Sequence, residues 1–398
     1  MAGLATPDSI VIPDSMLENA GITLIKDTVT DIDSVQKNVT LAGGRTIPFD
    51  KLLLANGASP VVPQIEGCDL QGVFTLRSTP DAQAMTEYMK TRQVTRLTLV
   101  GAGFIGLEVG TLLKSTRPEL EVTVIELLDY PLPQMLDQDM ATKVTTYLAE
   151  QGIRLETGRK VVNLNGENEF VTGVELDSGV IVDTDMVLMS VGVRSNLELA
   201  GKAGLEIGTT GIRVNEYLET SHPDIFAAGD NVENHCLITG KPSPGQLRGI
   251  AVSQGRLVAK RLAGASIAFP GVLNNSCVKL FDLCAAGVGL TEKQAAQNNL
   301  PTAVFTVDSR SKHGMIEGTK PWTLKVIFNS DTRKVIGSQI ISMSEPPAKE
   351  IDTMNLAIKL GATPEDLFSI NCAGHPDLSS EPSLEPIAIV GAQASGKI

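Results

Sequence analysis

The chain has 398 residues, more than a single hydrophobic core usually supports, so its length predicts two or three domains. It carries 33 lysines and arginines against 46 aspartates and glutamates, and the net charge of −13 argues against binding to nucleic acid or to anionic membrane surfaces. Its ten Phe, four Tyr and one Trp are also too few for a platform on which single strands could stack.

The beginning of the chain and its cysteines predict a cytoplasmic protein. Residues 1–13 have neither a cationic start nor an apolar stretch, and no run of about 18 apolar residues occurs anywhere. The five cysteines are odd in number and widely spaced, and no CxxC pair is present, so we expect reduced thiols. The cysteines are Cys68, Cys236, Cys277, Cys284 and Cys372.

Short strands and one helix are expected in the first 90 residues. The expected strands cover residues 22–26, 37–41, 46–48 and 51–55, and the expected helix covers residues 79–89. Leu52, Leu53 and Leu54 form a continuous apolar run that ends at Asn56-Gly57. Such a run predicts a strand that is buried on both faces.

A strand, a glycine-rich turn and a helix are expected next. The strand covers residues 97–100, and Gly101, Gly103 and Gly106 follow it in the spacing GxGxxG. In a dinucleotide site, Gly101 permits the turn, Gly103 lets the backbone approach a pyrophosphate, and Gly106 lets helix and strand pack closely. The N–H groups and the positive dipole end at the start of the helix would bind the phosphates. A purely structural tight turn is the alternative.

The helix and the following strand complete a βαβ unit. An apolar stripe with a period of 3.6 residues is expected to face the core, and it consists of Ile105, Val109, Leu112 and Leu113. The next strand, residues 122–125, ends at Glu126, whose carboxylate can accept hydrogen bonds from ribose hydroxyls. Glu126 would repel a 2′-phosphate, and no Arg stands among the next four residues. The pattern therefore predicts binding of NAD(H) rather than NADP(H).

The remaining elements predict more parallel sheet and then a different domain. Strands 173–176 and 186–191 are expected to continue the sheet, and a strand over 225–228 ends at Gly229-Asp230 before a helix over 246–262. The last 120 or so residues change character. Residues 322–328 and 335–341 alternate around a turn as a hairpin would, and a helix over 349–360 ends at Gly361.

Four segments of the chain resemble those of one known family, and they occur in the same order as in that family. They are residues 97–110, the segment KLLLANGASP at 51–60, the segment SVGVR at 190–194 and the segment TSHPDIFAAGD at 220–230. Together they resemble the pyridine nucleotide-disulfide oxidoreductases, and most closely the branch of NADH oxidases and CoA-disulfide reductases. The resemblance implies an α/β flavoprotein fold with two Rossmann-like dinucleotide-binding domains and a C-terminal α+β dimerisation domain. Hydride would pass from NADH to FAD and on to an acceptor.

The resemblance also implies domain boundaries. Residues 1–90 would form a partial FAD-binding domain, residues 91–215 the NAD(H)-binding domain, residues 216–273 the continuation of the FAD-binding domain, and residues 274–398 the dimerisation domain of a homodimer. The family begins with a strand, a GxGxxG turn and a helix for the ADP half of FAD, and residues 1–50 offer no such glycine-rich turn. The N-terminal part of the FAD domain is therefore expected to be missing, together with the redox-active cysteine of the family.

By the same resemblance, five residues would lie close to a cofactor. Asp230 would hydrogen-bond a ribityl hydroxyl of FAD, with Gly229 allowing close approach, although an Asp can also simply end a strand. Gly57 and Ala58 would lie beside the flavin, where Asn56 replaces the usual Thr of the family. Gly192 would pass near the cofactor.

Two further residues are candidates for catalysis. Glu108 would face the nicotinamide, or it is simply a carboxylate favoured at a helix N-terminus. His375, followed by Pro376, resembles the histidine that the family presents across the dimer interface as an acid and base, with Glu381 as its candidate partner. A polar interface residue is the alternative for His375. The other histidines are isolated, so no metal site is predicted.

None of the five cysteines inherits the redox role of the family. Cys277 and Cys284 lie on apolar, strand-like stretches and are expected in the core. Cys372 lies three residues before His375, a spacing that can place a base near a thiol, but a structural role is expected.

The function predicted from these residues is that of an FAD-dependent oxidoreductase. It would pass hydride from NADH through FAD to a disulfide, oxygen, peroxide or an electron carrier. A flavin-free NAD(H)-binding or scaffold module, or the larger subunit of a split reductase, are the alternatives. Three explanations of the missing segment stay open: a shortened reading frame, a partner chain that supplies it, or a degenerate protein that no longer holds flavin.

Overall fold

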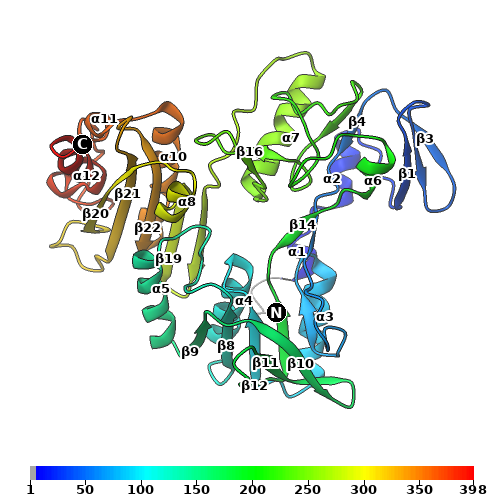
Figure 1. The fold of residues 1–398 in the computed structure, drawn as a ribbon, viewed down its shortest axis with the longest axis horizontal. Coiled ribbons are helices and arrows are strands. Elements are labelled where there is room, and N and C mark those ends of the chain that lie inside the picture. The colour runs from blue at the N-terminus through cyan, green and yellow to red at the C-terminus, as the bar shows by residue number, and fades with distance from the viewer. Residues whose placement is uncertain (1–5) are drawn as a thin grey trace. The chain divides into compact units, whose positions relative to one another are not determined.

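The computed structural model describes residues 6–398, and these divide into two compact units. Unit 1 comprises Pro60–Gly192 and Leu273–Ile398, and unit 2 comprises the described residues up to Ser59 together with Val193–Val272. The chain therefore leaves unit 2 after Ser59, returns to it at Val193 and leaves it again after Val272. Figure 1 shows the ribbon with the helices and strands labelled. The finer domain boundaries predicted from the sequence stay a prediction.

Five parallel strands form the first sheet of unit 1. Their order across the sheet is β6-β13-β7-β8-β9. The bounds are β6 (Val73–Thr75), β13 (Met186–Met189), β7 (Arg96–Val100), β8 (Glu121–Glu126) and β9 (Ile153–Thr157), and the helices packed on them are α3 (Thr79–Thr91), α4 (Phe104–Thr116) and α5 (Gln138–Glu150). The chain order reverses at β7, which is the switch point at which open α/β sheets bind ligands.

The predicted strand, turn and helix are confirmed as β7, the glycine turn and α4, but the predicted apolar stripe of α4 is only half right. Val109 and Leu113 are buried, whereas Ile105 and Leu112 are 41% and 44% exposed. The buried face is rotated because α4 approaches the sheet through two glycines. A Cβ atom added at Gly110 would lie 2.5 Å from the side chain of Leu99 in β7.

A second, antiparallel sheet of unit 1 corrects another prediction. Its order is β10-β11-β12, with β10 (Val161–Glu167), β11 (Phe170–Leu176) and β12 (Ile181–Asp183). The strand expected over residues 173–176 belongs to β11 and therefore does not continue the parallel sheet. It pairs with β10 because the chain reverses in a tight turn at Asn168 and Glu169, both of which have positive φ.

The C-terminal part of unit 1 is a five-stranded antiparallel sheet with helices. Its order is β18-β19-β22-β21-β20, which confirms the predicted hairpin as β21 and β22. The strands are β18 (Ser276–Leu280), β19 (Leu283–Gly289), β20 (Thr302–Arg310), β21 (Pro321–Asn329) and β22 (Val335–Ser342). The helices are α8 (Glu292–Gln297), α9 (Glu345–Ala348), α10 (Ile351–Leu360), α11 (Pro364–Phe368) and α12 (Pro386–Ser395), with a short 3-10 turn at Pro382–Leu384.

Burial in this sheet differs from the expected alternation. Nearly every residue of β21 and β22 is buried, because these strands are central in the sheet and helices α10 and α12 pack on it (Figure 1). The predicted helix over 349–360 is confirmed as α10, which ends at Gly361 with φ 71°. Residues of both large sheets share one hydrophobic core, so Leu97 of β7 and Leu280 of β18 belong to the same buried cluster.

Unit 2 contains four small sheets. They are the antiparallel β1 (Val29–Asp33), β2 (Asn38–Leu41) and β3 (Thr46–Pro48), the parallel pair β4 (Leu52–Leu54) and β15 (Ile225–Ala227), the pair β5 (Ala58–Pro60) and β14 (Val193–Ser195), and the pair β16 (Asn234–His235) and β17 (Pro242–Ser243). Its helices are α1 (Pro7–Ile10), α2 (Asp14–Asn19), α6 (Glu198–Lys202) and α7 (Arg248–Leu262).

Two predictions about unit 2 are wrong. Residues 22–26 form no strand, and Ile22 is 51% exposed, because no strand in the described part of the chain pairs with this segment. The run Leu52–Leu54 is not buried on both faces: Leu54 is buried, but Leu53 is 39% exposed. The reason is that β4 pairs with β15 alone and is not a central strand of a covered sheet.

Residues 6–50 contain two short helices and one antiparallel sheet. In this described stretch no parallel strand leads through a glycine turn into a helix. Across residues 6–398, no helix combines the length and the apolar character that a bilayer crossing requires.

Candidate functional site

The carboxyl ends of three neighbouring parallel strands bring the predicted dinucleotide residues to one edge of the sheet in unit 1. Strand β7 leads into the turn at Gly101, β8 ends at Glu126, and β13 leads to Ser190 and Gly192. Because β7 lies between β13 and β8, these turns are adjacent, and they surround the N-terminus of α4. The structure therefore places together all the residues predicted to bind NAD(H).

The three glycines of the turn have distinct geometries. Gly101 has φ 102°, and a Cβ atom there would lie 2.5 Å from the Ser190 carbonyl oxygen. A Cβ atom at Gly106 would lie 2.6 Å from the Gly101 carbonyl oxygen, so only glycine lets α4 start this close to β7. At Gly103 no atom lies within 4 Å of the added Cβ. The packing of the fold therefore does not require glycine at position 103, and the open space there leaves room for a diphosphate at the helix N-terminus.

Ser190 fixes this turn and was not predicted from the sequence. Its hydroxyl donates to the carbonyl oxygens of Val100 and Gly101, at 3.1 and 3.0 Å. Both carbonyls belong to the end of β7, so Ser190 ties β13 to the glycine turn. The only signal in the sequence is the position of Ser190 directly after a buried strand.

Glu126 holds the other side of the turn. It is 8% exposed, and its carboxylate accepts the N–H of Ala102 at 2.7 Å and the N–H of Leu128 at 2.8 Å. Each carboxylate oxygen keeps a further lone pair, so a ribose hydroxyl can still donate to it. The carboxylate therefore has a structural role in the turn besides the predicted contact with ribose.

Glu108 on α4 lies against the C-terminal sheet. It is half-buried, it accepts the backbone N–H of Lys279 in β18, and burial raises the pKa of its carboxyl group above the usual 4.5. The N–H of Lys279 opposes this rise in pKa because it favours the charged form. The contact with nicotinamide stays a prediction.

The raised pKa of Glu108 predicts a pH-dependent cost in stability. Because folding raises this pKa, protonation of Glu108 stabilises the folded state. This stabilisation is complete below pH 4.5, the usual pKa of the group, and it is lost as the pH rises through the raised pKa. We therefore expect Glu108→Gln to be more stable than the unmodified chain at pH 8 and to show a smaller gain at pH 4. Melting temperatures of both proteins across this range measure the difference, and a gain that does not grow with pH contradicts the assignment.

The predicted flavin residues of unit 2 meet at the carboxyl edge of β4 and β15. These strands are parallel, so Gly57 after β4 and Gly229 after β15 lie at the same edge. Both glycines have positive φ, 66° and 89°. The N–H of Gly229 donates to Gln254 at 2.8 Å, Ala58 is 5% exposed, and Asp230 is half-buried.

A buried acceptor at this edge tests whether FAD fits here. Asn231 is fully buried, and its amide nitrogen donates to the Leu54 carbonyl at 3.1 Å and to Asn56 at 2.8 Å, while its Oδ1 has no partner in the described chain. A buried acceptor without a donor costs about 1–3 kcal/mol, so Oδ1 fits a ligand hydroxyl or an ordered water. The residues fit the ribityl end of FAD, whereas residues 6–50 supply no glycine turn for its diphosphate.

The predicted pair of His375 and Glu381 does not form within the chain. The Glu381 carboxylate lies 3.6 Å from Nε2 of His313, a histidine that the sequence analysis left without a partner. His375 is exposed, and its Nδ1 accepts the N–H of Asp377 at 3.2 Å. The reason is a tight turn, in which the N–H groups of Leu378 and Ser379 donate back to the His375 carbonyl.

None of the five cysteines forms a disulfide. All five are free, and burial raises the pKa of Cys284 and Cys372, which disfavours their thiolates. The expected core position of Cys284 is confirmed, but Cys277 is exposed, which corrects the prediction. Cys277 is exposed because β18 is an edge strand and its alternate side chains face solvent.

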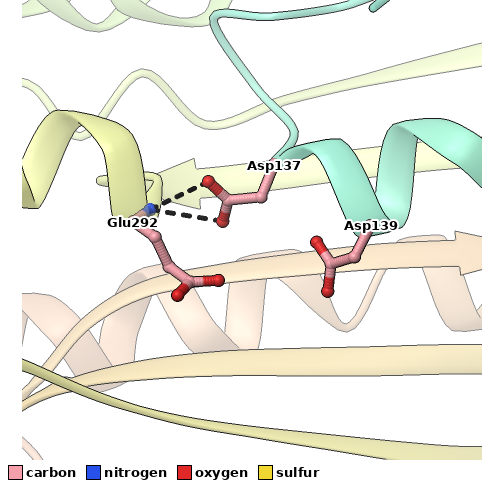
Figure 2. A group of neighbouring side chains, drawn as sticks. All are labelled: Asp137, Asp139 and Glu292. Atoms are coloured by element: carbon pink, nitrogen blue, oxygen red, sulfur yellow. Dashed lines mark hydrogen bonds between the residues drawn. The ribbon is translucent and has the colours of Figure 1, made fainter.

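Three carboxylates of unit 1 lie close together, as Figure 2 shows, and the ammonium group of a buried lysine contacts all three. Asp137 precedes α5, Asp139 lies in its first turn, and Glu292 begins α8 and donates its N–H to both Asp137 oxygens. Nζ of Lys325, which is 1% exposed, lies 2.5 Å from Glu292, 2.7 Å from Asp139 and 3.3 Å from Asp137. The ammonium group supplies the positive charge between these carboxylates, so we assign no cation to the cluster.

Two family models match the chain. The model described as pyridine nucleotide-disulphide oxidoreductase matches residues 6–255, and the model of the dimerisation domain of that family matches residues 276–385. The first match includes the segment before Lys51, so it does not support the prediction of a missing segment, which stays a prediction from residues 1–50.

Several proteins are similar over most of the chain. An NADH oxidase of Methanocaldococcus jannaschii is 37% identical over 379 residues, which are 94% of this chain and 83% of the relative. A CoA-dependent NAD(P)H sulfur oxidoreductase of Pyrococcus furiosus is 32% identical, covering 95% of this chain and 84% of the relative. The solved structure of an NAD-dependent persulfide reductase from A. fulgidus matches with a TM-score of 0.91 at 34% identity, covering 96% of this chain and 71% of that one.

Proposed function

Because the chain belongs to the pyridine nucleotide-disulphide oxidoreductase family, we propose that it transfers hydride from NADH through FAD to a small acceptor. Membership of the family makes the chain an NAD(P)H-dependent flavoprotein oxidoreductase. Its fold is that of a flavoprotein with two dinucleotide-binding domains and a C-terminal dimerisation domain. The proposal adds the preference for NADH, the residues at each site and the homodimer.

The observation that carries the proposal is the glycine turn of unit 1. Gly103 leaves open space at the N-terminus of α4, and Gly101 and Gly106 are held by contacts that exclude any side chain. A diphosphate would lie against the first N–H groups of the helix, and the hydroxyls of the adenosine ribose would donate hydrogen bonds to Glu126. Gly192, whose Cβ position is also open and whose φ is 107°, would border the nicotinamide end, together with Glu108.

Unit 2 would hold FAD at the edge formed by β4 and β15. Gly57, Ala58 and Gly229 would let the cofactor approach the backbone, and Asp230 would accept a hydrogen bond from a ribityl hydroxyl. FAD, when bound, supplies the two-electron chemistry that links NADH to the acceptor. The residues of each unit would orient the cofactor bound to that unit.

The acceptor would be a small molecule or a small electron carrier. The relatives include proteins named as an NADH oxidase and as a polysulfide and persulfide reductase, which supports oxygen or a sulfur compound among the candidates. We also propose a homodimer formed through residues 274–398, in which the exposed ring of His375 would act as acid and base toward the partner's flavin. Five free cysteines support a cytoplasmic location.

The preference for NADH predicts the effect of changing Glu126. We expect Glu126→Arg to weaken NADH binding about tenfold and to improve the tolerance of NADPH, because the repulsion of a 2′-phosphate is replaced by attraction. Glu126→Gln is the matched control, because its amide oxygen can keep one backbone N–H and adds no positive charge. Dissociation constants for both nucleotides measure the effect. An unchanged ratio of NADPH to NADH affinity in Glu126→Arg contradicts the assignment.

One experiment tests the function as a whole. The purified chain is expected to take up FAD, which its visible absorbance reports, and to oxidise NADH with an artificial electron acceptor. A colourless protein that takes up no FAD and leaves NADH unchanged overturns the proposal. Binding of NADH without turnover, unaffected by added FAD, favours the second candidate, a flavin-free NAD(H)-binding module.

A further inference from the structure

Three asparagine side chains connect the segment by which the chain leaves unit 2 with the segment by which it returns. Asn56 lies just before the exit at Ser59, Asn196 lies just after the return at Val193, and Asn231 follows β15. All three belong to unit 2, and we call them the amide clasp. None of them was a candidate in the sequence analysis.

The first two asparagines bind each other reciprocally. The Asn56 amide donates to the Asn196 carbonyl at 3.1 Å, and the Asn196 amide donates to the Asn56 carbonyl at 2.8 Å. The backbone N–H of Asn196 donates to the Gly57 carbonyl at 3.0 Å, and the Ser59 hydroxyl donates to the Asn196 side chain at 2.8 Å. The two segments are therefore joined by four hydrogen bonds within a few residues.

The third asparagine anchors this pair in the interior. Asn231 is fully buried and donates to the Asn56 side chain at 2.8 Å and to the carbonyl at the end of β4 at 3.1 Å. Next to Asn196, the Ser195 hydroxyl donates to the Asp230 carbonyl at 2.7 Å. The clasp therefore binds Gly57 directly, through the N–H of Asn196, and constrains Asp230 through its two neighbours in the network, Ser195 and Asn231.

We propose that Asn56, Asn196 and Asn231 are positioning residues that hold Gly57 and Asp230 at the spacing required for flavin binding, and that Oδ1 of Asn231 accepts a hydrogen bond from the bound flavin or its ordered water. The inference rests on the proposed function. Strands β4 and β15 have three residues each and form a two-stranded sheet, to which Phe226 adds one isolated bridge with Glu219, so this short backbone ladder is a weak constraint on their ends. Asparagines that merely favour turns would bond within their own segments, but these bonds join separate segments.

Single variants test the clasp. Asn196→Ala and Asn56→Ala are each expected to weaken FAD binding about 3- to 10-fold, since each removes positioning hydrogen bonds. The double variant is expected to lose little more than either single variant, because both belong to one coupled set. Affinity for NADH, whose predicted site is in unit 1, is expected to stay unchanged. The matched control is Asn298→Ala, which removes a side-chain bond to the Gln294 carbonyl in unit 1.

Flavin fluorescence measures FAD affinity. Amide hydrogen exchange of residues 56–59 and 193–196 measures, in the absence of flavin, how strongly the clasp protects the two segments from opening. Faster exchange together with weaker FAD binding supports the proposal. Unchanged FAD affinity in both single variants overturns it, even where the melting temperature falls. Should the alanine variants fail to fold, Asn196→Asp keeps the acceptor for Ser59 and loses only the donor, and it is expected to show the same change in FAD affinity. Absence of FAD uptake by the unmodified chain is the separate result that overturns the proposed function.

Discussion

Gly103→Ala is expected to bind NADH roughly ten- to a hundredfold more weakly while it unfolds at the same temperature as the unmodified chain. The fold tolerates alanine at this position, because φ is −83° and no atom lies within 4 Å of the added Cβ. The new methyl group would instead occupy the space in which a diphosphate approaches the amide groups of α4. Calorimetric titration with NADH and thermal unfolding measure the two effects separately.

Gly106→Ala provides the contrast within the same turn. Its Cβ atom would lie 2.6 Å from the Gly101 carbonyl and 2.4 Å from the Ser190 hydroxyl, so the backbone of the turn has to shift. We expect this variant to lose both NADH affinity and thermal stability. If Gly103→Ala binds NADH as tightly as the unmodified chain, the glycine turn is not the dinucleotide site. If both variants lose stability equally, the open space at Gly103 has no functional meaning.

The elements that the sequence predicted correctly are those with a local chemical cause. The strand before Gly101, the turn and helix α4 follow from an apolar run, three glycines and an amphipathic stretch, all between Arg96 and Thr116. Helix α10 likewise ends at a glycine in the left-handed conformation. At these sites the neighbouring residues determine the backbone, so a pattern in the sequence is sufficient.

The failures involve contacts between distant parts of the chain. Leu53 is exposed and residues 22–26 form no strand, because burial and strand pairing depend on which neighbours a segment finds. Ser190 and Asn231 bind backbone carbonyls that lie 90 and 177 residues away in the chain. Lys325 in β21 carries no sign in the sequence that it is buried. No local pattern records such partners.

Lys325→Met is expected to lower the free energy of unfolding by about 3 kcal/mol, the low end of the range for breaking a buried ion pair. The lysine is 1% exposed, and its removal leaves Asp137, which is 6% exposed, without a positive neighbour. Asp139 and Glu292 are 57% and 43% exposed, so water can hydrate them and the cost comes mainly from Asp137. Urea unfolding of the two proteins measures the difference.

Two control variants separate charge burial from the loss of a lysine. Lys349→Met removes an exposed ion pair with Asp352 and is expected to leave the free energy of unfolding nearly unchanged. Asp137→Asn in the Lys325→Met background removes the stranded charge and is expected to restore part of the stability, while its amide can still accept the N–H of Glu292. Because Asp137 also bonds Gln339 of β22, this cluster joins α5 of the parallel sheet to the C-terminal sheet. A Lys325→Met variant as stable as the unmodified chain would mean that the buried ammonium group does not stabilise this junction.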